Sequence, residues 1–144
     1  MINLNTGDIT LFHSQFLINR FLTSEDIEKG VPELIVQKNN FRSDYYEYCL
    51  WGNFEKNQYI YFTLQFHPKN QLRRICIYPQ HHGFLGAPQP NSSKCSADWL
   101  EVKRWYHKYF QQKNEYADYP WGEFRFIKGS DDIYFPTKID IRYK

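Results

Sequence analysis

The chain has 144 residues, the usual size of a single domain. Its formal net charge of +2 is too small to indicate nucleic-acid binding from charge alone. No apolar stretch approaches the ~20 residues of a membrane-spanning helix, and no secretory signal is expected. The 4 Trp, 12 Tyr and 12 Phe favour strands, and so many tyrosines predict that some lie on a binding surface. The three cysteines form no C-x-x-C pair, which is typical of a reducing cytoplasm.

The first third of the sequence predicts a small hairpin and a short helix. Apolar residues alternate in segments 2–4 and 9–12, on either side of a glycine-containing turn. A helix is expected over residues 23–30, because Thr23 or Ser24 can cap its first amides and acidic residues follow in the first turn. A glycine and then a proline mark its end.

The middle of the chain predicts an antiparallel meander. Its clearest strand alternates strictly, so that Tyr59 and Tyr61 lie on the face opposite four apolar residues. Pro79 is expected to end the last strand of the meander. The three strands are predicted over residues 44–51, 59–66 and 72–78, with turns at residues 52–53 and 68–70.

The second half predicts a long loop over residues 80–95, then a helix, then a final hairpin. The helix is expected over about residues 96–112, with an apolar stripe facing the sheet. Trp105 lies off the centre of this stripe, which leaves it either partly exposed or in the core. The hairpin joins residues 121–127 to residues 133–135 or 139–143, with a turn at residues 131–132.

Together these elements predict one α+β domain over residues 1–144. Its architecture is a mainly antiparallel sheet of five to seven strands, with one principal helix (about 96–112) packed on one face.

No catalytic constellation stands out in this sequence. The phosphate-binding, dinucleotide-binding, zinc-protease and serine-hydrolase motifs are all absent. The pair His81 and His82 could bind a metal or act as acid and base, but neighbouring side chains of an extended chain point to opposite faces. A surface loop pair is the favoured interpretation. The sequence therefore predicts no catalytic residue, no cofactor and no metal site.

Aromatic and basic side chains instead indicate an interaction surface. Tyrosine, tryptophan and arginine dominate the contacts that matter most between proteins, and the same residue types can stack on RNA bases. The low net charge favours a protein partner. The predicted partner-binding residues come from the meander, the long loop and the helix: Tyr59, Tyr61, Arg74, His81, His82, Phe84, Lys103, Arg104 and Trp105.

Several segments along the whole chain carry a family resemblance. They are the opening strand with Thr6-Gly7-Asp8-Ile9, the helix start Thr23-Ser24-Glu25-Asp26, the strand Leu72-Arg73-Arg74-Ile75-Cys76-Ile77-Tyr78, then Asp98-Trp99-Leu100, Tyr119-Pro120-Trp121-Gly122-Glu123 and Ile139-Asp140-Ile141-Arg142-Tyr143. Taken together, the chain resembles immunity proteins of bacterial contact-dependent growth inhibition systems, which are encoded beside polymorphic toxins.

This resemblance implies a cytoplasmic protein that binds the C-terminal domain of one cognate toxin, such as a nuclease, and blocks it. It implies no enzyme activity and no cofactor. We therefore expect a monomer that binds its toxin 1:1, with no membrane and no direct nucleic-acid contact. Two other functions stay open from the residues alone: a small metal-free RNA-cleaving enzyme that uses His81 or His82, and an RNA-binding module.

Overall fold

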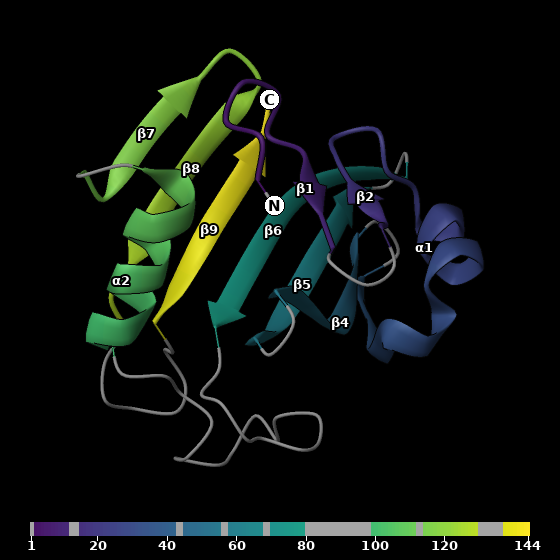
Figure 1. The fold of residues 1–144 in the computed structure, drawn as a ribbon. Helices are drawn as coiled ribbons and strands as arrows, with labels where there is room; N and C mark the ends of the chain where they lie inside the picture. The colour runs from purple at the N-terminus through teal and green to yellow at the C-terminus, as the bar shows by residue number, and fades with distance from the viewer. Residues whose placement is uncertain are drawn as a thin grey trace.

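Seven antiparallel strands form the main sheet of this computed structural model, in the order β3-β4-β5-β6-β9-β8-β7 (Figure 1). The structure describes residues 2–11, 15–42, 45–55, 58–67, 70–79, 99–111, 114–129 and 137–144. The main sheet consists of β3 (Ile35–Arg42), β4 (Tyr45–Glu55), β5 (Gln58–His67), β6 (Gln71–Pro79), β7 (Tyr116–Tyr119), β8 (Gly122–Ile127) and β9 (Lys138–Tyr143). The other elements are β1 (Ile9–Thr10), β2 (Leu17–Ile18), the helices α1 (Ser24–Gly30) and α2 (Trp99–Phe110), and a 3₁₀ turn, η1 (Pro32–Leu34). The predicted class, a single α+β domain with a mainly antiparallel sheet, is confirmed.

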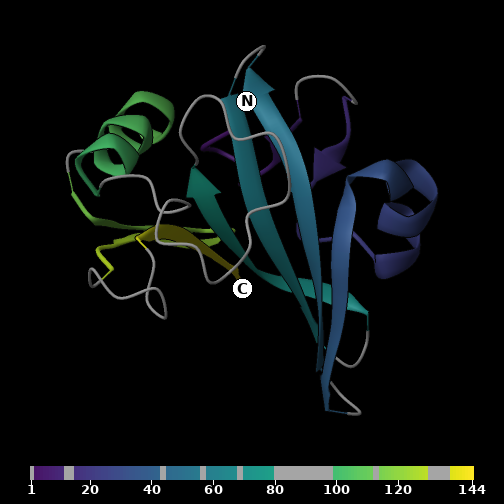
Figure 2. The same ribbon diagram turned by 90° about the horizontal axis from the view of Figure 1, so that it is seen from below.

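The core lies on one face of the sheet. Because directly paired residues point to the same side, the register carries one row of apolar side chains across four strands: Leu64, Ile75, Ile141 and Phe124. All four are fully buried. Helix α2 covers β8 and β9 on this face, and the β1–β2 pair lies over the middle of the sheet (Figure 1). Figure 2 shows how strongly the sheet twists between β9 and β4.

Helix α1 begins and ends as the sequence indicates. Thr23 is the N-cap, and it forms a capping box in which the side chains of Thr23 and Asp26 accept hydrogen bonds from each other's backbone amides. The Thr23 hydroxyl also donates to the Asp26 carboxylate at 2.7 Å, and this bond, together with the one from the Thr23 amide, lowers the pKa of Asp26. The helix is tied to the sheet by the hydroxyl of Tyr48, which donates to Glu28. Ile27 is its buried contact with the core.

A β-bulge in β6 keeps two consecutive arginines out of the core. Leu72 and Ile75 are both buried, although two arginines separate them and strict alternation would place one arginine in the core. The register shifts here, since Phe66 pairs with Leu72 while the preceding residue pairs with Arg74. Arg73 is therefore the extra residue of the bulge, and both arginines avoid the core.

Gly7 and Gly122 lie where a Cβ atom would collide with a neighbouring group. Gly7 has a φ of +76° and lies against the indole ring of Trp121. Gly122 opens β8 so close to the backbone carbonyl of Arg142 that a Cβ atom has no room. The Trp121 indole donates a hydrogen bond to the Leu4 carbonyl at 2.8 Å, which fixes the N-terminal segment to this end of the sheet. The segment Pro120-Trp121-Gly122 thus has a structural role, because its first two residues form the turn between β7 and β8.

Several predicted elements need correction. The prediction of a turn at residues 52–53 is wrong, because β4 continues to Glu55. Within this strand, Gly52 pairs with Ile60 of β5 and lies under the side chain of Leu11. The first hairpin is reduced to an isolated bridge between Ile2 and Ile9, and β1 pairs mainly with β2. Strands β3 and β7 were not predicted. The described part of the final helix is α2, and β8 pairs with β9, the second of the two expected partners.

Candidate interaction surface

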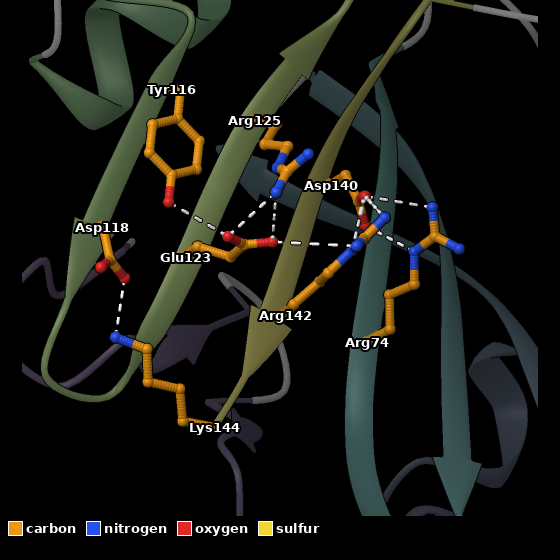
Figure 3. A network of polar contacts seen from close by, with 8 residues as sticks. All are labelled: Arg74, Tyr116, Asp118, Glu123, Arg125, Asp140, Arg142 and Lys144. Atoms are coloured by element: carbon orange, nitrogen blue, oxygen red, sulfur yellow. Dashed lines mark hydrogen bonds and ion pairs between the residues drawn. The ribbon is translucent and has the colours of Figure 1, made fainter.

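The face of the sheet opposite the helices carries a network of paired charges at β6, β8 and β9 (Figure 3). Alternate residues of these strands point here because their neighbours face the core. Register then places Arg74 beside Arg142, and Arg142 beside Glu123, while Asp140 pairs with Arg125. We call this set, with Tyr116 of β7, the arginine network: Arg74, Arg125, Arg142, Glu123, Asp140 and Tyr116.

A buried carboxylate holds one half of the arginine network in place. Asp140 has no solvent-accessible surface. Its oxygens accept hydrogen bonds from Nε and Nη2 of Arg74 at 2.5 and 3.1 Å, and from Nε of Arg142 at 3.1 Å. Figure 3 shows both guanidinium groups turned toward this carboxylate. Charge-assisted, partly bidentate contacts of this kind fix both the position and the direction of an arginine.

The carboxylate of Glu123 holds the other half of the arginine network in place. Its carboxylate lies 3.0 Å from Nη2 of Arg125 and 3.8 Å from Nη1 of Arg142, and it accepts a hydrogen bond from the Tyr116 hydroxyl at 3.2 Å. The guanidinium of Arg125 also lies over the ring of Tyr116, 5.2 Å from its centre. The hydrogen bond to Glu123 raises the pKa of Arg125. Each exposed group is therefore braced by at least one neighbour.

The outward-facing members of the arginine network are an arginine pair and a tyrosine. The side chains of Arg125 and Arg142 are 44% and 45% exposed, and Tyr116 is 47% exposed. The two acids lie beneath them, since the Glu123 side chain is only 19% exposed. Such an arrangement presents donors and an aromatic ring in fixed positions, which suits binding to another molecule.

A tyrosine pair continues this face toward β5. The rings of Tyr61 and Tyr78 lie 5.8 Å apart, and the ammonium of Lys138 lies 5.9 Å from the centre of the Tyr78 ring. Burial raises the pKa of both tyrosines, so their hydroxyls stay protonated at neutral pH. Cys76 lies buried between this pair and the arginine network, and burial raises the pKa of its thiol as well.

The structure places the predicted site residues on two different faces. Tyr61 and Arg74 lie on the outer face, where Arg74 is engaged by Asp140. On α2, across the sheet, Lys103 lies 3.4 Å from Glu115 and Arg104 is exposed. The helix residues and the strand residues therefore cannot form one patch. The side chain of Tyr59 and the residues His81, His82 and Phe84 lie outside the described parts of the structure.

Trp105 belongs to the core and not to an exposed anchor. It is 5% exposed, and its ring packs 4.6 Å from Tyr109 and 6.3 Å from Phe110. Val102, Tyr106 and Phe110 are also buried, so the apolar stripe of α2 includes Trp105. Of the two alternatives left open by the sequence, the structure shows the second.

Sequence reasoning missed most of the arginine network. Only Arg74 was predicted, while Arg125, Arg142, Glu123, Asp140 and Tyr116 were not. The available signal is the pairing of opposite charges two residues apart in each of the last two strands, at positions 123 and 125 and at positions 140 and 142. Such pairs share a face of a strand. Their convergence also depends on the register between β8 and β9, which no local pattern reveals.

The chain matches no family model, no curated protein and no solved structure among those compared. Within the described ranges, no group of three or more metal-ligating side chains converges. No helix in the same parts of the chain is long and apolar enough to cross a membrane.

Proposed function

We propose that this chain is an immunity protein, which binds the C-terminal domain of a cognate bacterial toxin and occludes it in the cytoplasm. The observation that carries the proposal is the arginine network, in which two carboxylates hold Arg125, Arg142 and Tyr116 ready for a partner. Binding to a preorganised surface loses little side-chain entropy, which favours tight and specific complexes. The family resemblance of the sequence points to the same function.

Internal pairing of the arginines favours a protein partner over RNA. Nucleic-acid affinity depends on cations that neutralise phosphates and release counterions. Here Arg74 and Arg142 share the Asp140 carboxylate, and Arg125 is paired with Glu123. The arginine network, with three arginines and two carboxylates, therefore has a net charge of only +1. Tyrosine and arginine within a balanced polar surround are typical of the centre of a protein interface.

The proposed mechanism is occlusion by a rigid surface, with one immunity protein bound to one toxin domain and no cofactor. Tyr116 and Arg125 act as anchors, and the charged residues around them form the polar rim. Because such a complex covers the toxin, neutralisation requires binding and no chemical step.

Affinity capture from the native cells tests this proposal. The wild-type protein and the variant Arg125→Glu serve as matched baits, followed by mass spectrometry of the bound proteins. We expect the wild type, and not the variant, to recover the C-terminal part of a large secreted protein. Expression of that fragment alone should stop growth, and co-expression of this chain should restore it. Recovery of RNA only, or of a fragment whose toxicity this chain does not relieve, would contradict the proposal.

A further inference from the structure

A tight turn before α1 presents an arginine and a phenylalanine to solvent. The backbone amide of Leu22 donates to the Asn19 carbonyl at 3.0 Å, and the amide of Phe21 donates to the Asn19 side chain at 2.9 Å. The turn is anchored by Ile18 and Leu22, which are 0% and 5% exposed. Its shape is therefore fixed from both sides.

Phe21 is the most exposed large apolar residue described, with 72% of its surface accessible. The guanidinium of Arg20 lies 4.6 Å from the centre of its ring, so the two side chains form one unit. An aromatic ring held in water by a rigid turn adds nothing to the core. It is available for contact with another molecule.

Two hollows flank this Arg20–Phe21 unit, which lines both of them. The first has a volume of about 220 Å³ and is also lined by Arg73 of the β6 bulge, Tyr143 and Lys144. The second, of about 370 Å³, is also lined by Asp8 and Trp121. Both lie at the end of the sheet where β6 begins and β9 ends.

The first hollow is cationic. Among the described residues, neither Arg20 nor Arg73 takes part in an ion pair, whereas Lys144 is bound to Asp118 at 2.7 Å. The bulge that keeps Arg73 out of the core thus also leaves it at this hollow. A carboxylate that entered the first hollow would meet two arginines, and no acidic residue of its lining would compete for them.

We propose that the Arg20–Phe21 unit and the first hollow are a second contact site for the protein partner. The site takes an Asp or Glu side chain of the partner, which pairs with Arg20 and Arg73, while an adjacent apolar side chain packs on Phe21. The inference rests on the proposed function for one point, that the partner is a protein. An acidic side chain is the expected occupant because its charge is complementary to the two arginines.

Titration of the isotope-labelled protein with small probes tests the chemistry of the site directly by NMR. The probe is 3-phenylpropionate, and its control is 3-phenylpropionamide, which keeps the ring and loses the charge. We expect saturating amide shifts at residues 20–22 and 71–73 with the carboxylate, and at least tenfold weaker binding of the amide. The substitution Arg73→Ser should abolish the difference between the two probes. Equal responses to both probes, or no shifts at these residues, would overturn the proposal.

Two further titrations decide between occupants. Inorganic phosphate and an oligothymidine should each shift these amides less than the carboxylate does, and a stronger response to either would overturn the proposal of a protein occupant. In the complex recovered by affinity capture, Phe21→Ser should weaken binding at least tenfold without changing the melting temperature. Unchanged affinity would also overturn the proposal. Failure to recover a toxin would leave the probe titrations intact, so the two proposals fail separately.

Discussion

Replacement of Asp140 by Asn is expected to lower the free energy of unfolding by about 3 kcal/mol. The substitution keeps the size of a side chain that has no exposed surface and removes its charge. Three charge-assisted hydrogen bonds from Arg74 and Arg142 end on the carboxylate, and each such bond contributes roughly 1.5 to 3 kcal/mol. The two arginine side chains are 29% and 45% exposed, so water replaces part of what they lose. The net cost is therefore well below the sum of the three bonds.

Urea unfolding followed by tryptophan fluorescence measures this cost, with the m-value as a check that both variants unfold in the same way. The matched control is Glu25→Gln, which removes an ion pair with Lys29 whose side chains are 70% and 78% exposed. Exposed pairs of this kind contribute only ~0.5 kcal/mol. A loss for Asp140→Asn that is no larger than the loss for Glu25→Gln would contradict the conclusion that the buried Asp140 carboxylate holds Arg74 and Arg142 in place.

Four further substitutions test other parts of the fold. Thr23→Ala removes the capping box of α1 and should cost about 1 kcal/mol in urea unfolding. Gly122→Ala should cost at least about 2 kcal/mol because its methyl group meets the Arg142 backbone, while Gly52→Ala, with ordinary contacts only, should cost less than about 1 kcal/mol. Burial raises the pKa of Tyr143, so its contribution to stability is present below the unfolded-state pKa of ~10 and is lost as the pH rises above it. Tyr143→Phe should therefore cost about 1 kcal/mol at pH 8, where the hydrogen bond to the Gly7 carbonyl is lost, and should lose less stability than the wild type between pH 10 and 11.

The parts of the fold that the sequence predicts well are those with a strong local pattern. Strand β5 alternates between fully buried and outward-facing residues, and Thr23 begins a helix with the residues that caps require. Strand β7 has only four residues, with alanine and aspartate in the middle, and it exists because it pairs with β8. Edge strand β3 is mostly polar after its first two residues. Neither of these strands has a local signal strong enough to predict it.

The candidate site was harder to predict than the fold because it depends on contacts between distant residues. Arg74 and Asp140 are 66 positions apart in the chain, and the β6–β9 register alone brings them together. The β6 bulge adds a second difficulty. Compared with strict alternation, the bulge moves every side chain after Arg73 to the opposite face of the sheet. Its position is known only once the partners of all the strand residues are known.

In the proposed complex, the partner binds the outer face of the sheet through the arginine network. Calorimetric titration of the captured toxin domain tests it most directly, with the wild type, Tyr116→Ala and Arg125→Ala on the outer face, and Arg104→Glu on α2 as the control. We expect at least tenfold weaker binding for each outer-face variant and unchanged binding for the helix variant. Unchanged affinity of both outer-face variants, with a loss for Arg104→Glu, would contradict it and move the interface to the helical face.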